Sequence, residues 1–147
     1  MKYNALYEHG FALKCHRPEA PARCSFFIQS RGDNAGRPTW APMRNCFALT
    51  CAPEDVGGYY YLVYALWQAK RFAPYIHGSV IPLIRIGDVW RLIADNLDTR
   101  PRIEKALPTL DALNSAEANY TRQLSLIKEC RCVLLRQITR PAATDAG

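Results

Sequence analysis

The stretch APEDVGGYYYLVYALWQAKRF, from Ala52 to Phe72, decides the fold class. Residues 53–55 (PED) are typical of a first helical turn, where acidic side chains meet the positive end of the helix dipole. Lys70 and Arg71 suit a last turn, and Pro74 is expected to stop the helix. The apolar stripe between them is wide, which predicts a helix that is buried on most sides. It comprises Tyr60, Val63, Tyr64, Trp67 and Phe72, broadened by Tyr59, Leu62 and Leu66.

Short strands are predicted before this helix. ARCSFFIQS, residues 22–30, and NCFALTC, residues 45–51, alternate their side chains as strands do. RGDNAGRP separates them and is rich in turn-forming residues. Two further pieces are predicted at Tyr3–Tyr7 and Phe11–Cys15. Strands and one aromatic-rich helix together predict an α+β fold with a small mixed sheet.

The segment HGSVIPLIRIGDVWRLI, residues 77–93, follows the aromatic helix. It predicts a turn at Gly78 and Ser79, a short buried strand at Val80–Ile86 and a short helix at Asp88–Ile93. A unit of this kind presents backbone and side chains at one edge, which is typical of a recognition surface. A loop is expected at Asn96–Arg100.

A long helix is predicted at the C-terminal end, because apolar residues recur there with a period of about 3.5 residues. Pro108 interrupts the pattern, so the helix is expected to start there, with Pro108 in its first turn. From Pro108 to Thr139 it would be about 48 Å long at roughly 1.5 Å per residue, too long for a small domain to cover. It is expected to project or to pair with a partner. The seam positions are Ile103, Ala106, Leu110, Leu113, Glu117, Tyr120, Leu124, Ile127, Arg131, Leu134 and Ile138.

The composition is that of a folded, basic protein. Hydrophobic residues make up 49% of the 147 residues, which excludes disorder throughout. The net charge of +6 favours an acidic partner such as nucleic acid, although many small basic proteins bind none. Residues 1–51 carry seven Lys or Arg against three Asp or Glu, so the first third is the expected site of a basic face.

The lack of a signal-peptide pattern and of long apolar runs predicts a cytoplasmic protein without a membrane span, in which the six cysteines are expected to be reduced thiols rather than disulfides. Cys46 and Cys51 have four residues between them, whereas Cys130 and Cys132 have only one and would point to different faces of a helix, so no matched set of zinc ligands is seen. Small buried thiols are the favoured alternative to a zinc site. No metal or other cofactor is expected.

Catalytic motifs are missing from the sequence. It has no G-x-S-x-G, no H-E-x-x-H and no Walker loop, and its three histidines are scattered. Glu54 and Asp55 are explained by their place at a helix start. The sequence therefore predicts a protein that is not an enzyme.

The order of these elements resembles one target recognition domain and one conserved helix of a type I restriction–modification specificity subunit. That family has a glycine-rich loop with an Arg after a strand, then an aromatic helix, a GS…P.I turn, a short helix and a long helix. The matching stretches are SRGDNAGRP, YYYLVYALWQAKRF and GSVIP, within Ser25–Ile138. The chain is also similar to small proteins of Bacteroidetes encoded near mobile elements. One departure is ADNLDTRPRI, which stands where the family has an IPLPP-type strand.

The resemblance implies a division into three parts. Residues 1–100 would form a target-recognition-like α+β domain, 101–139 a spacer or dimerisation helix, and 140–147 a disordered tail. The family's chains carry two domains and two helices, so this chain would be a half and would act as a dimer. The dimer contacts would come from Leu110, Leu113, Tyr120, Leu124, Ile127, Leu134 and Ile138.

The resemblance also implies double-stranded DNA as the partner. Arg side chains can bind phosphate or read guanine, and Asn can read adenine, but such residues in surface loops are often only solvated. The candidate DNA-binding residues are Arg31, Asn34, Arg37, Lys70, Arg71, His77, Ser79 and Arg85. Tyr and Trp side chains on the aromatic helix can stack on bases, although their helical spacing favours core packing. The two glycine-bearing loops would have to lie on one face.

A second hypothesis remains open beside DNA binding. The domain would keep its fold while the long helix docks a protein, either a second copy or a host restriction–modification subunit, as an anti-restriction factor would. Glu117 and Arg131 would then be able to pair across an antiparallel dimer.

Overall fold

A computed structural model describes residues 9–19 and 24–141. It divides the chain into two compact units, Met1–Leu107, called the head here, and Pro108–Gly147. The predicted strand at Tyr3–Tyr7 and residues 142–147 of the predicted tail lie outside the described residues.

The head contains a four-stranded sheet in the order β1-β4-β2-β3. All of its pairings are antiparallel, where a mixed sheet was expected. A parallel pair needs a long crossover, usually a helix, and none of the described residues between these strands forms a helix. The predicted α+β class is confirmed. The strands are β1 (Phe11–Cys15), β2 (Phe26–Gln29), β3 (Pro38–Thr39) and β4 (Cys46–Cys51).

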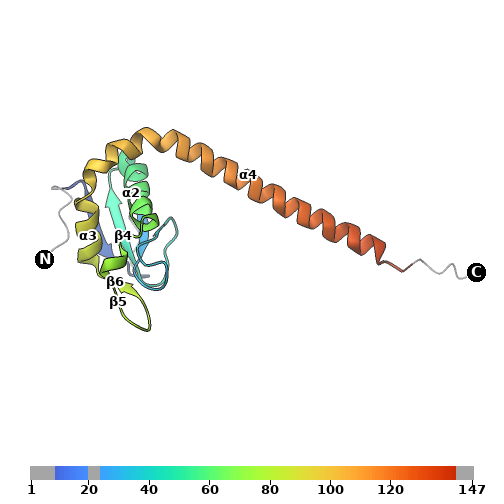
Figure 1. The fold of residues 1–147 in the computed structure, drawn as a ribbon, viewed down its shortest axis with the longest axis horizontal. Coiled ribbons are helices and arrows are strands. Elements are labelled where there is room, and N and C mark those ends of the chain that lie inside the picture. Colours follow the sequence, from blue (N-terminus) through green and yellow to red (C-terminus); the bar gives the residue numbers. More distant parts are fainter. Residues whose placement is uncertain (1–8, 20–23, 142–147) are drawn as a thin grey trace, which may run out of the picture. The chain divides into compact units, whose positions relative to one another are not determined.

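One face of the sheet packs against two helices, α2 (Val56–Gln68) and α3 (Ile86–Ala94) (Figure 1). Alternation along the strands places large apolar side chains on this face. Helix α2 contributes the buried side of its aromatic stripe, and α3 contributes Val89, Leu92 and Ile93. The sheet side of the core comprises Phe11, Leu13, Phe26, Ile28, Phe47 and Leu49, and the α2 side Tyr59, Leu62, Val63 and Leu66.

Helix α2 is shorter than the predicted helix at both ends. It follows a 3-10 turn, η1 (Pro53–Asp55), and ends at Gln68 rather than beyond Arg71. Lys70 has φ = 54°, and the amide of Arg71 reaches back to the carbonyl of Leu66 at 2.9 Å. This left-handed cap closes the helix before Pro74 is reached, and a second 3-10 turn, η2 (Ala73–Tyr75), follows.

The segment after η2 forms a two-stranded hairpin, β5 (Ile76–His77) with β6 (Leu83–Ile84). The strand predicted at Val80–Ile86 is therefore mostly wrong, because Val80 and Ile81 lie in the turn of the hairpin. Gly78, at φ = 98°, makes that turn possible. Figure 1 shows the hairpin at one end of the head.

The long helix, α4 (Arg100–Ile138), has 39 residues and follows a 3-10 turn, η3 (Leu97–Thr99). Its predicted start at Pro108 is wrong. An ion pair between Arg100 and Asp55, at 3.0 Å, holds the first turn of α4 against the start of α2. Arg100 also pairs with Glu104, one turn further along α4, at 2.6 Å. Pro108 therefore lies inside the helix, and its missing N–H leaves the carbonyl of Glu104 without its helical donor.

Candidate functional site

Backbone hydrogen bonds join the two glycine-bearing loops of the head. The amide of Gly32 donates to the carbonyl of Pro82 at 2.8 Å, and the amide of Ile84 donates to the carbonyl of Ser30 at 3.0 Å. Arg31 thereby pairs with Leu83 as an antiparallel bridge. The first loop thus adds a third segment to the β5–β6 hairpin.

The register of this small sheet brings three of the predicted residues to one surface. Leu83 pairs with His77 on one side and with Arg31 on the other. Residues paired across antiparallel strands have side chains on the same face, and Arg85 follows Leu83 by two positions in extended backbone. We call the surface formed by Arg31, His77, Leu83 and Arg85 the hairpin face. The opposite face is directed inward, because Ser30 and Ile84 are buried.

One acidic side chain accompanies these cations. Asp88, in the first turn of α3, places Oδ2 4.0 Å from Nε2 of His77. Ser79 is exposed and lies in the hairpin turn beyond His77. The hairpin face can therefore offer two guanidinium groups and one imidazole to an anion, with the carboxylate of Asp88 beside His77.

The remaining predicted residues lie around the C-terminal end of α2. Arg37 is exposed, with its guanidinium carbon 5.5 Å from the centroid of the Trp67 ring. Asn34 is exposed, and its carbonyl accepts the amide of Arg37 at 2.9 Å. Lys70 and Asp33 line a pocket of about 310 Å³ whose apolar wall includes Trp67. Arg71 is exposed beside it.

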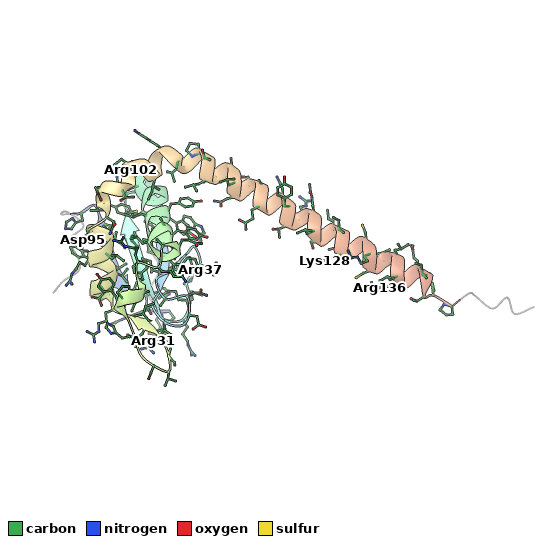
Figure 2. All side chains as sticks on the ribbon, in the orientation of Figure 1. Arg31, Arg37, Asp95, Arg102, Lys128 and Arg136 are labelled. Carbon is green, nitrogen blue, oxygen red and sulfur yellow. The ribbon has the colours of Figure 1, made fainter. Side chains whose placement is uncertain are left out.

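Loop 30–37 connects these two groups of residues. Its glycine at position 36 lies against the Phe72 ring so closely that a Cβ would come within 2.5 Å of a ring carbon. Figure 2 shows Arg31 near the hairpin and Arg37 beside α2. One short loop therefore positions both groups.

Two further cations at this end of the head were not singled out from the sequence. The amide of His16 donates to the carbonyl of Cys46 at 2.9 Å, and the amide of Ser30 donates to that of Asn45 at 3.0 Å. Arg17 and Arg44 therefore leave the sheet at the same end as the first glycine-bearing loop. At the other end of the head, Arg100 is neutralised by Asp55 and Glu104. The head is consequently more basic at its hairpin end.

The aromatic residues of α2 divide between core and surface. Tyr59 is fully buried and donates its hydroxyl to the carbonyl of His9 at 2.6 Å. Tyr60 is half-buried, and burial raises its pKa. It stacks on Trp40 with ring centroids 4.0 Å apart, and Trp40 is 59% exposed. Core packing therefore accounts for Tyr59, while the outer rings, Tyr61, Tyr64 and Trp67 included, are half-buried.

The cysteines are free thiols, and Cys46 and Cys51 are buried. Burial raises the pKa of both thiols, so they are neutral near pH 7. Within residues 9–19 and 24–141, no three His, Cys, Asp or Glu side chains are grouped so that they could hold a metal ion.

The seam residues of the long helix are exposed from Leu113 onward, and Leu110 is half-buried. None of the 39 residues of α4 is buried. An amphipathic helix gains little stability unless its apolar side is covered, so this surface suits a partner. Leu135 borders the predicted seam, whereas Leu126 and Val133 lie on another side of the helix. The exposed apolar set is Leu113, Tyr120, Leu124, Leu126, Ile127, Val133, Leu134, Leu135 and Ile138.

Fold and site define a class of small α+β proteins with a basic, glycine-loop end and a long, exposed amphipathic helix. The chain belongs to the family of unknown function DUF6943, which matches residues 13–137. Neither curated proteins nor solved structures yield a match to the chain. In the part of the chain that the structure describes, no helix is both long and apolar enough to span a membrane.

Proposed function

We propose that the chain is a DNA-binding recognition module that acts as a dimer and is similar to half of a type I restriction–modification specificity subunit. The observation that carries the proposal is the register that puts Arg31, His77 and Arg85 on the hairpin face. Arg side chains bind phosphate oxygens and guanine edges, and amides in glycine loops bind phosphate. Arg37, Lys70 and Arg71 would extend this surface along the end of α2.

An electrophoretic shift with random-sequence duplexes, run at low and high salt, tests DNA binding. About five phosphate contacts would lower the affinity by roughly 500-fold over a fourfold rise in salt. The variant Arg31→Ala/Arg85→Ala should bind at least tenfold more weakly, about 1.4 kcal/mol. Arg102→Ala, at the other end of the head, is the matched control (Figure 2). The proposal fails if the native chain causes no shift at low salt.

The dimer is expected to form through the seam of α4. Residues 108–121 carry Asp111 and Glu117 and no Lys or Arg. Residues 122–140 carry five Lys or Arg against Glu129 alone. An antiparallel pair sets the acidic half of one helix against the basic half of the other, whereas a parallel pair opposes like charges. Light scattering measures the molar mass in solution and so tests whether the chain is a dimer.

A protein-interaction module without DNA binding is the second candidate, and the exposed seam favours it. The partner would be a restriction–modification subunit of the host, engaged as an anti-restriction factor would engage it. Apolar contacts tolerate salt, so this complex should survive about 0.5 M salt, where DNA binding through exposed charges is screened. A clean dimer that shows no shift at low salt would favour this candidate.

A further inference from the structure

Two large aliphatic side chains stand at the tip of the β5–β6 hairpin. Val80 is 90% exposed and Ile81 is 57% exposed. Gly78 closes the turn so tightly that a Cβ there would lie 2.5 Å from the carbonyl oxygen of Ile81. Pro82 restricts the backbone on the other side. We call Val80 and Ile81 the hairpin tip.

The base of the tip is braced by the first glycine-bearing loop. The Gly32–Pro82 hydrogen bond lies directly behind Ile81 and ties the hairpin to a segment that is itself anchored in the sheet. A tip held in this way loses little conformational freedom when it binds a partner, which favours affinity. The rigid turn is therefore suited to inserting the two side chains into a narrow binding site on a partner.

Basic groups surround this apolar tip. The hairpin face places Arg31 and Arg85 on the strands just behind it, and His77 precedes the turn. The carboxylate of Asp88 lies beside His77 on this face. Scattered exposed apolar residues are ordinary, but a projecting pair flanked by cations is a specific combination.

We propose that the hairpin tip is a wedge that enters the minor groove of double-stranded DNA and partly unstacks one base step. This inference rests on the proposed DNA binding and adds the groove and the mode of contact. Proteins kink DNA by inserting apolar side chains such as Ile, Leu, Met or Phe between base steps, while cations bind the flanking phosphates. Flexible steps such as TpA accept a kink at the lowest energy.

The size of the tip favours DNA over other partners. A stable protein interface covers about 800 Å² on each side, far more than two aliphatic side chains supply. Stable membrane anchoring likewise needs much more buried apolar surface. One or two side chains are sufficient for a wedge, because the remaining contacts are made with phosphates.

The test uses the full chain and a duplex of roughly 25 base pairs with 2-aminopurine beside a central TpA step. Binding of the native protein at low salt should raise the fluorescence of the probe, which reports unstacking. The variant Val80→Ser/Ile81→Ser should still bind, about tenfold more weakly, and should lose the rise in fluorescence. Met43→Ser removes another exposed apolar side chain of the head and should behave as the native protein does.

The outcomes separate the wedge from DNA binding itself. If the native protein shifts the duplex without a rise in fluorescence, and the double variant binds equally well, the wedge is wrong while DNA binding stands. If the native protein does not bind duplex at all, both are wrong. Binding to anionic vesicles that is lost in the double variant would then assign the tip to membranes. Unchanged thermal unfolding excludes misfolding of the variant.

Discussion

The amide of Gly32 and the carbonyl of Pro82 are 2.8 Å apart, although fifty positions separate the two residues in the sequence. Gly32 adopts φ = 87°, a conformation that residues with a Cβ avoid. Together with the hydrogen bond from Ile84 to Ser30, this contact pairs the first loop with the hairpin and so forms the hairpin face.

Substitution of Gly32 by Ala should therefore weaken both the fold and the hairpin face. The left-handed backbone would cost an alanine about 1–2 kcal/mol of unfolding free energy. Urea unfolding measures this loss, and DNA affinity in the shift assay should fall with it. Asp33→Ala, at the exposed neighbouring position, should change the unfolding free energy by no more than about 0.5 kcal/mol. Equal stability of the Gly32→Ala and native proteins would contradict this account of the junction.

A second prediction concerns Arg100, whose guanidinium carbon lies 4.8 Å from the centroid of the Tyr59 ring. Burial lowers the pKa of Arg100, but the hydrogen bond to Glu104 and the charges nearby outweigh it and raise the pKa overall. Arg100→Met should cost about 1–2 kcal/mol, because Asp55 and Glu104 lose a partly buried partner. The exposed Arg102, changed to Met, is the control. Thermal unfolding that is equal in the two variants would show that the ion pairs contribute little.

Local patterns in the sequence were enough to predict much of this fold. Alternation marked the centres of β2 and β4, and the wide apolar stripe marked α2, because both periods arise within a few residues. The start of α4 was misplaced for a physical reason. The local penalty of Pro108 is offset by contacts that Arg100 makes with Asp55, a residue far away in the sequence.

The candidate site was predictable in its residue types but not in its arrangement. Gly and Arg in two loops were visible in the sequence, whereas the pairing of Arg31 with Leu83 depends on tertiary packing. Val80 and Ile81 were misassigned to a buried strand, because an apolar run gives the same signal in a core and at a tip. The position of Gly78 and Pro82 on either side was the available clue.

A third prediction follows from the place of Pro108 inside α4. A proline in a helix interior costs about 3 kcal/mol, since it removes a hydrogen bond and crowds the preceding turn. Pro108→Ala should therefore strengthen the helix around this position. Hydrogen exchange should become slower at the amides of residues 104–112. Ala112→Pro should have the opposite effect, and unchanged exchange in both variants would contradict the prediction.

A fourth prediction concerns alkaline pH. Burial raises the pKa of Cys46, Cys51 and Tyr59 in the folded head. In the unfolded chain the thiols ionise near 9.0 and the phenol near 10.0. Above these values the unfolded state binds fewer protons than the folded state, so the free energy of unfolding falls as pH rises. The stabilisation is fully present below about pH 9 and is lost as pH rises toward the folded pKa values.

Urea unfolding from about pH 7 to about pH 10, with reductant present, measures this fall. Cys51→Ala removes one of the groups whose pKa is raised and should make the fall shallower. Cys15→Ala, at an exposed position, is the matched control. A free energy of unfolding that is constant across the range would show that these groups do not resist ionisation in the folded head.

The last prediction concerns the pairing of α4 with a second copy. Glu117 and Arg131 lie seven positions on either side of Leu124, so an antiparallel pair that crosses at Leu124 brings each Glu117 to an Arg131 of the other chain. Glu117→Arg and Arg131→Glu would each oppose like charges twice in the dimer. Each should weaken it by about tenfold or more, and the double variant should recover.

Sedimentation equilibrium of the four proteins measures these dissociation constants. Arg122→Glu makes the same change in net charge as Arg131→Glu but lies outside the predicted seam, and it should leave the dimer nearly unchanged. In a parallel pair, Glu117 would face Glu117 and Arg131 would face Arg131, so the double variant would again oppose like charges and gain nothing over the native chain. Recovery in the double variant therefore requires the antiparallel arrangement. If the Arg131→Glu variant dimerises as tightly as the native protein does, the predicted pair between Glu117 and Arg131 is wrong.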